Sequence, residues 1–251
     1  MARKTKTVLI TGASSGIGAA TAVLASKSGY DVGIHYNSDL KGAQLVAQMC
    51  EREGAITHMF QGDVASEADV ERIFEEFDAA FPQMDALVNN AGIVDKPQRV
   101  EEMSYERLRR MVDVNLIGAM MVAQQGVLRM SKAFGGDGGV IVNLGSAAAR
   151  LGSAGQYVDY AATKAGIDIF TKGLSDEVAA DGVRVVAIRP GLIETAIHAK
   201  GGLPDRCDDL ADTVPMKRPG EAEECAHTIM FLLGEGASYI TGTSVDVSGG
   251  R

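Results

Sequence analysis

The chain has 251 residues, of which 46% are hydrophobic and 23% charged, as in an ordinary globular protein with a sizeable core. A net charge of -9 argues against nucleic acid as a partner, because nucleic-acid-binding proteins present a basic face to phosphates. The three cysteines show neither metal-ligand nor paired spacing, so we expect reduced thiols and no metal site.

The N-terminal segment is basic and then briefly apolar, as in a secretion signal. Its apolar run covers only Val8 to Ile10, whereas a signal needs about 7 to 15 apolar residues. No stretch approaches the roughly 18 apolar residues of a membrane span. We therefore expect a cytoplasmic protein with no membrane partner.

Short apolar runs alternate with longer amphipathic segments. In chain order, strands are predicted at 7–11, 31–36, 56–60, 85–90, 139–144, 183–190 and 244–249. Helices are predicted at 15–28, 39–53, 66–80, 105–133, 156–180 and 221–233, where apolar residues recur three and four apart. Strand followed by helix, six times over, predicts an α/β fold: a parallel sheet with helices on both faces, in one domain over 1–251.

The segment 195–220 departs from this alternation. It contains a Gly-Gly pair and three prolines, and its apolar residues show weak periodicity. We expect a mobile insert near the strand ends that serves as a substrate lid, and a plain connecting loop is the alternative.

A glycine-rich turn joins the first predicted strand to the first helix. In "TGASSGIGAATAVLA", the residues Gly12, Gly16 and Gly18 allow a tight turn and a close approach of backbone to a ligand. The spacing is GxxxGxG, which differs from both the GxGxxG fingerprint and the P-loop. Its position at a helix N-terminus nevertheless predicts a site for the pyrophosphate of a dinucleotide.

The tip of the second strand indicates which dinucleotide is preferred. A carboxylate there would bind the ribose 2'-hydroxyl of NAD and repel the 2'-phosphate of NADP. This chain has Tyr36, Asn37 and Ser38 instead, and the first acid is Asp39. No arginine is present in the glycine loop or at the strand tip, so hydroxyl and amide donors would bind the phosphate. NADP is the expected cofactor, with NAD possible.

Five motifs follow one another along the chain, namely "TGASSGIG" (11–18), "NNAG" (89–92), Ser146 in "NLGSAA", "YAATK" (160–164) and "RPG" (189–191). With these motifs the sequence resembles the short-chain dehydrogenase/reductase (SDR) family in its short, single-domain form. The resemblance implies a Rossmann-type doubly wound sheet of about seven strands and NAD(P)-dependent interconversion of a secondary alcohol and a ketone. It also implies a homo-oligomer, a tetramer or a dimer.

The resemblance further implies a catalytic tetrad and a set of cofactor residues. The tetrad is Asn115, Ser146, Tyr160 and Lys164, in which Asn115 would position a water that relays protons to Lys164. The implied cofactor residues are Gly12, Ser14, Ser15, Gly16, Ile17 and Gly18 around the phosphates, Asp63 and Val64 at the adenine, Asn90, Ala91 and Gly92 at the ribose side, Pro190, Gly191, Ile193 and Thr195 at the nicotinamide, and Tyr160 and Lys164 at its ribose.

Two tyrosines precede Lys164 in "QYVDYAATK", and helical geometry distinguishes them. Four residues advance about 6 Å with an offset near 40°, so Tyr160 neighbours Lys164, and Tyr157 lies a turn further away. We expect the ammonium to lower the pKa of the Tyr160 phenol, which then acts as general acid and base while Ser146 bonds the same substrate oxygen. The Tyr157 to Lys164 spacing matches enoyl-thioester reductases, which reduce C=C bonds, but the ordinary glycine loop favours Tyr160.

A second class of function is a dinucleotide-binding sensor without catalysis, although all four tetrad residues are present. We expect a small carbonyl or alcohol substrate, with Arg99, Arg150 and His198 as candidates to meet an anion. Helices 105–133 and 156–180 are the expected interface of the oligomer.

Overall fold

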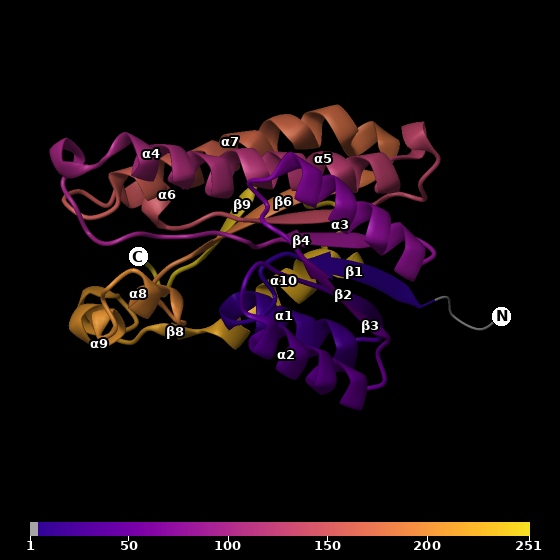
Figure 1. Cartoon of the computed structure of the whole chain (residues 1–251), viewed down its shortest axis with the longest axis horizontal. Coiled ribbons are helices and arrows are strands. Elements are labelled where there is room, and N and C mark those ends of the chain that lie inside the picture. Colours follow the sequence, from indigo (N-terminus) through magenta and orange to yellow (C-terminus); the bar gives the residue numbers. More distant parts are fainter. Residues whose placement is uncertain (1–4) are drawn as a thin grey trace.

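The computed structural model describes residues 5–251, apart from the Lys200 side chain. The chain forms three layers, in which a parallel sheet lies between two layers of helices (Figure 1). The seven strands lie in the order β3-β2-β1-β4-β5-β6-β9, and every neighbouring pair is parallel. Their bounds are β1 (Lys6–Ile10), β2 (Tyr30–Tyr36), β3 (Thr57–Gln61), β4 (Ala86–Asn89), β5 (Gly139–Leu144), β6 (Val183–Pro190) and β9 (Ser244–Val247). The predicted seven-stranded Rossmann-type sheet is confirmed.

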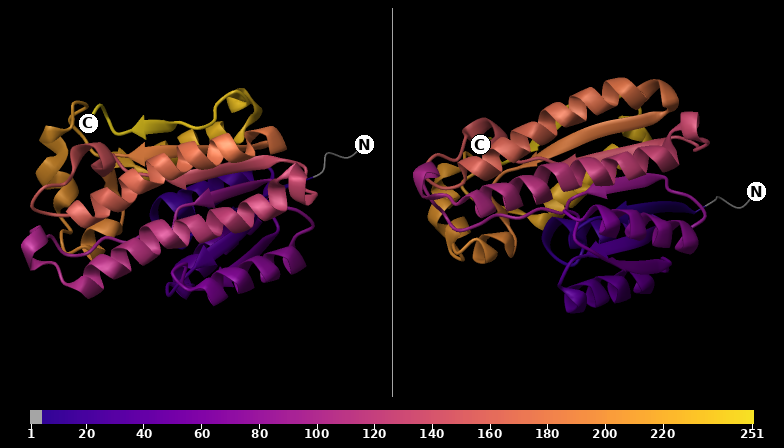
Figure 2. Two further views of the ribbon diagram at one scale, coloured as in Figure 1. Left: turned by 90° about the horizontal axis from the view of Figure 1, so that it is seen from above. Right: turned by 45° about the horizontal axis from the view of Figure 1, so that its top comes forward.

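Helices cover both faces of this sheet, as the sequence predicts. One layer consists of α1 (Gly16–Lys27), α2 (Leu40–Arg52) and α10 (Ala222–Leu233). The other consists of α3 (Glu67–Ala80), α4 (Tyr105–Val112), α5 (Ala119–Met130) and α7 (Val158–Val178), and the short α6 (Ala148–Leu151) packs against α7. Figure 2 shows α4 and α5 end to end as one long helix that runs beside α7 across the sheet.

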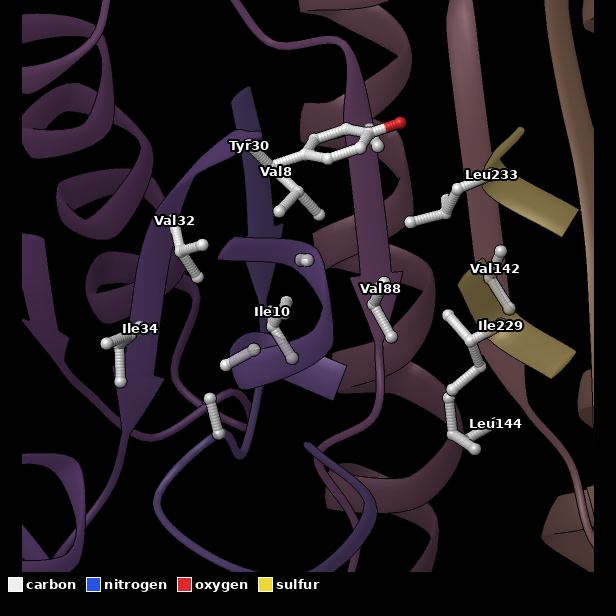
Figure 3. Close-up of a cluster of buried hydrophobic side chains, with 14 of the residues drawn as sticks. Val8, Ile10, Tyr30, Val32, Ile34, Val88, Val142, Leu144, Ile229 and Leu233 are labelled. Carbon is white, nitrogen blue, oxygen red and sulfur yellow. The ribbon is translucent and has the colours of Figure 1, made fainter. Parts of the chain in front are cut away.

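Two apolar cores form because alternate side chains of each strand point to opposite faces. Val8 and Ile10 on β1 belong to the core beneath α1, α2 and α10, which also contains Ile229 and Leu233 beside Val142 (Figure 3). Leu9, between them in sequence, belongs to the core beneath α3, α5 and α7. The strands are therefore apolar on both sides and read as continuous apolar runs.

The predicted helix 105–133 contains a π-helical segment, η2 (Asp113–Gly118), between α4 and α5. The continuous helix Tyr105–Met130 is long and apolar enough to cross a membrane, so the expectation that no stretch reaches this length is wrong. Val122 and Ala123 of α5 are buried, and α5 packs against β4 and β5. This apolar face thus belongs to the protein core, and the length alone is weak evidence for a membrane span.

The segment 195–220 folds at the edge of the sheet where the parallel strands end (Figures 1 and 2). It contains α8 (Ile197–Lys200) and α9 (Arg206–Leu210). A small second sheet closes its base by pairing β7 (Ile193–Glu194) with β8 (Gly220–Glu221). The segment is therefore structured rather than a plain connecting loop.

Candidate active site

A cavity of about 800 Å³ opens at the carboxyl ends of β1, β4, β5 and β6. This is the edge at which doubly wound sheets bind their ligands. Most residues proposed from the sequence meet here: the lining includes Gly12, Ser14, Ser15, Gly16, Ile17, Asn37, Ser38, Asp63, Val64, Asn90, Ala91, Gly92, Ser146, Tyr160, Lys164, Pro190, Gly191, Ile193 and Thr195.

The glycine loop fits a pyrophosphate at the start of α1. Gly12 and Gly16 have φ of +64° and +57°, a backbone conformation that other residues rarely adopt. Ser15 is the N-cap residue of α1 and makes no side-chain capping bond, so the first-turn N–H groups have no side-chain acceptor there. These donors and the positive end of the helix dipole suit an anionic ligand.

Asn90 holds this loop from the neighbouring strand. Its Nδ2 donates to the carbonyl oxygens of Thr11 and Gly12 at 2.8 and 3.1 Å. Thr11 Oγ1 in turn accepts from the backbone N–H groups of Asn90 and Ala91, both at 2.9 Å. The Asn90 side chain therefore positions the loop, and Thr11 is a site residue that the sequence analysis missed.

His35 is a second support that the sequence analysis missed. Its Nδ1 accepts from the backbone N–H of Gly12 at 3.1 Å, which leaves the proton on Nε2 to be donated to the Gly62 carbonyl, also at 3.1 Å. The ring is 2% exposed, and burial lowers the pKa of His35 from 6.5 to about 4. A neutral imidazole thus links β2 to the glycine loop and to the end of β3.

The buried His35 predicts a loss of stability in acid. Between pH 6.5 and about 4 the unfolded chain binds a proton at His35 that the folded chain does not, so folding is weakened as the pH falls. The loss is about 3 kcal/mol at pH 4. Guanidinium unfolding at pH 7 and pH 4 should show this extra loss in the wild type and its absence in His35→Gln, which can keep both bonds. Equal losses in the two proteins would contradict the assignment.

Two cofactor residues inferred from the sequence do not face the cavity. Tyr36 is 7% exposed, packs in the core with β2 and is not among the residues that line the cavity. Gly18 is required for close packing, since a Cβ there would lie 2.5 Å from the Gly12 carbonyl oxygen and 2.6 Å from Asn90 Nδ2. Asn37 and Ser38 remain as the polar groups at the strand tip.

Ser146, Tyr160 and Lys164 meet at one wall of the cavity. Ser146 follows β5, and its hydroxyl lies near enough to the phenol of Tyr160, on the first turn of α7, to influence the pKa of that phenol. Lys164 lies one turn further along α7, with its Nζ 5.7 Å from the centre of the Tyr160 ring. The ammonium is buried and donates to the Leu144 carbonyl at 2.7 Å. The predicted helical neighbours are therefore brought together with the serine.

Burial, rather than the charge of Lys164, dominates the shift in the pKa of Tyr160. Burial raises the pKa of the Tyr160 phenol, and the nearby Ser146 hydroxyl opposes this rise. Burial also lowers the pKa of Lys164 to about 8, because the ammonium has only a carbonyl partner and the nearby charge of Asp168. The low dielectric that surrounds both groups favours their neutral forms, so Tyr160 is held protonated.

Asn115 lies in the π-helical segment behind this wall. Its Oδ1 accepts from the backbone N–H of Ile93 at 2.8 Å, and its Nδ2 donates to the Ile93 carbonyl at 2.9 Å. The side chain does not line the cavity and is already paired, so the side-chain amide is a poor candidate for the expected water. It fixes the turn after Gly92, whose Cβ, if present, would lie 3.2 Å from Asn115 Oδ1 and 3.5 Å from Lys164 Nζ.

The second tyrosine, Tyr157, also lines the cavity, but in another setting. It is the N-cap residue of α7, and the guanidinium of Arg206 lies over its ring, 5.2 Å from the ring centre. Burial raises the pKa of its phenol.

Within residues 5–251, no three His, Cys, Asp or Glu side chains form a group able to hold a metal ion.

Comparison with known proteins gives consistent matches over nearly the whole chain. A family model described as "Enoyl-(Acyl carrier protein) reductase" matches residues 12–251. The uncharacterized oxidoreductase YgfF of Escherichia coli is 45% identical over 97% of this chain and 98% of its own length. The 3-oxoacyl-[acyl-carrier-protein] reductase FabG of Staphylococcus epidermidis is 34% identical over 98% of each chain.

Solved structures are similar to the same extent. A 3-ketoacyl-(acyl-carrier-protein) reductase from Brucella melitensis, complexed with NADH, has a TM-score of 0.90 and 34% identity over 98% of both chains. A short chain dehydrogenase from Burkholderia cenocepacia, in complex with NADP, has a TM-score of 0.89 and 28% identity over 98% of this chain and 97% of its own. The fold, the cavity and these matches show that the chain belongs to the short-chain dehydrogenase/reductase family of NAD(P)-dependent oxidoreductases.

Proposed function

We propose that this protein interconverts a ketone and a secondary alcohol, with Tyr160 as general acid and base and NADP(H) as the preferred cofactor. The observation that carries the proposal is the meeting of Ser146, Tyr160 and Lys164 in the cavity that the glycine loop also lines. A hydride source and a proton source can thus meet at one substrate carbonyl.

A dinucleotide held by the glycine loop would supply a hydride for the carbonyl carbon. As the C=O bond becomes an alcohol, the Tyr160 hydroxyl gives its proton to the oxygen, and in the reverse direction the phenolate takes it back. Ser146 donates a hydrogen bond to the same oxygen and stabilises its developing charge. Lys164 faces the cavity one turn away, and its positive charge favours the phenolate left after proton transfer.

Reduction of a C=C bond through Tyr157 is the alternative, and the description of the matching family model names that activity. Carbonyl chemistry is favoured because Tyr160, not Tyr157, lies beside both Ser146 and Lys164. The Tyr157 ring is covered by Arg206 instead. A dinucleotide-binding sensor without catalysis is less favoured still, because such a protein would not require Ser146, Tyr160 and Lys164 to lie together in the cavity.

The preference for NADP(H) depends on the end of β2. Asn37 and Ser38 line the cavity there as possible donors to a phosphate. The nearest carboxylate, Asp39, caps α2 by accepting from the Gly42 N–H at 3.0 Å, so it is partly neutralised by the helix. Arg110, the arginine nearest the adenine residues, is paired with Asp63 at 2.9 Å.

We also propose that 195–220 acts as a lid over this cavity, because Ala196, Ile197, His198 and Arg206 contribute to its wall. A homo-oligomer is proposed from the large apolar side chains exposed on the long helices, among them Val112, Ile117 and Ile169.

The expected cytoplasmic location of the protein stays a prediction.

The proposal is tested by assaying the purified protein against a panel of ketones and 2-enoyl thioesters, with NADPH and with NADH, at 340 nm. Ketone reduction with a higher kcat/KM for NADPH is expected. Reduction of the enoyl thioesters alone would support the Tyr157 alternative, and no turnover of either class while NADPH still binds would support the sensor.

A further inference from the structure

The walls of the cavity differ in charge along its length. Its two acidic lining residues within the described part of the chain, Asp39 and Asp63, both belong to the adenosine end. The opposite end, beyond Tyr160, is lined by Arg206 from the proposed lid, and the other lining residues of the cavity include Arg251 but no further Asp or Glu. In a protein with a net charge of -9, this leaves a positive substrate end.

Arg206 has contacts that orient it without neutralising it. Its Nη1 donates to Gln156 Oε1 at 2.8 Å, and its guanidinium carbon lies 5.2 Å from the centre of the Tyr157 ring. Across residues 5–251, no carboxylate lies within ion-pair distance of this guanidinium, and its acidic neighbours on α9, Asp208 and Asp209, do not line the cavity. A planar donor set therefore faces the cavity with its charge unpaired.

The three cations that the sequence suggested as partners of an anionic substrate, Arg99, Arg150 and His198, are poorly placed to bind one. Arg99 is paired with Glu101 and exposed, and Arg150 is paired with Asp246 outside this cavity. His198 does line the cavity, but its Nε2 is bonded to the Ile193 carbonyl at 2.9 Å and burial lowers its pKa. Arg251 also lines the cavity, but Arg206 is the cation that lies over the Tyr157 ring, beside the expected ketone site.

We propose that the substrate is a short oxo acid, whose carboxylate is bound by Arg206 while its ketone meets Tyr160 and Ser146. This assignment rests on the proposed ketone chemistry and names its substrate class. Arg206 lies over the Tyr157 ring, and Tyr157 precedes Tyr160 by three residues in the lining of the same cavity. From this proximity we infer a short substrate with few bonds between carboxylate and ketone, such as a 3-oxo or 4-oxo acid.

Substrate binding without turnover tests the assignment directly. Tyr160→Phe protein saturated with NADPH is titrated with 3-oxobutanoate, 4-oxopentanoate, their methyl esters and a neutral 3-oxobutanoyl thioester, with nicotinamide fluorescence as the readout. At least one acid should bind more tightly than its ester and than the thioester. Adding Arg206→Gln should raise the Kd of that acid about 10- to 100-fold and leave the ester nearly unchanged, because only the acid loses a charged partner.

Two further variants separate recognition from structure. Arg206→Lys keeps the charge and should recover part of the affinity for the acid, and Arg99→Gln removes an arginine outside the cavity and should change nothing. Equal binding of acid and ester, preference for the thioester, or an equal loss for acid and ester in Arg206→Gln would each overturn the assignment. None of these binding results would contradict the proposed reduction of a ketone, because the turnover assay of the wild type tests that reaction separately.

Discussion

Tyr160→Phe is expected to lower kcat for ketone reduction about 10²- to 10⁴-fold, the usual contribution of a positioned general acid. The variant keeps the ring and loses the hydroxyl that lies near Ser146 and would give the proton to the substrate oxygen. The glycine loop is untouched, so the Kd for NADPH should stay near the wild-type value. Steady-state rates at 340 nm and nicotinamide fluorescence measure the two quantities.

Tyr157→Phe is the matched control, because it removes a phenol from the same cavity. Its ring can still lie beneath Arg206, and turnover should persist. The opposite pattern, with Tyr160→Phe active and Tyr157→Phe inactive, would transfer the role to Tyr157 and with it favour C=C reduction. Loss of NADPH binding in Tyr160→Phe would show that the substitution disturbs the site rather than its chemistry.

The shifted pKa values of the two helical neighbours bear on the direction of catalysis. Burial keeps Tyr160 protonated, and a protonated phenol is the form needed to reduce a ketone. Oxidation of the alcohol requires the phenolate, which Lys164 must stabilise with its own pKa lowered to about 8. Reduction should accordingly persist at a lower pH than oxidation does.

The sequence was sufficient for the layers of the fold and for the Tyr160 to Lys164 pair. Strands buried on both faces give apolar runs, and a four-residue spacing in a helix fixes two neighbours. The same continuous burial explains why the sequence misplaced Tyr36: β2 is buried on both sides, so no alternation shows which side chain packs in the core and which, like His35, turns toward the glycine loop.

Long-range contacts account for the rest of what was missed. Asn115 lies in a periodic helical window, and only its pairing with Ile93, 22 residues earlier, shows its position behind the cavity. Arg206 meets Gln156 across 50 residues, through a segment whose helices of four and five residues are too short for a clear periodic pattern. Such contacts depend on the packed fold, not on local sequence.

A buried ion pair beside the site should carry the largest effect on stability. Arg107 on α4 donates to Asp159 on α7 at 2.8 and 3.2 Å, and the two side chains are 6% and 2% exposed. Arg107 also donates to the Lys96 carbonyl and to Gln98 Oε1, so it holds the loop between β4 and α4. Removing one partner leaves a buried, unpaired charge.

Arg107→Ala is therefore expected to lower the free energy of unfolding by about 3 to 5 kcal/mol, as measured by guanidinium denaturation. Arg109→Ala, on the same helix, breaks an exposed pair with Asp113 and should cost less than about 1 kcal/mol. Combining Arg107→Met with Asp159→Leu removes both charges and should recover much of the loss, because the cost comes from the unpaired carboxylate. If the double variant were as unstable as Arg107→Ala, the bonds to the 96–98 loop would be the main contribution of Arg107 instead.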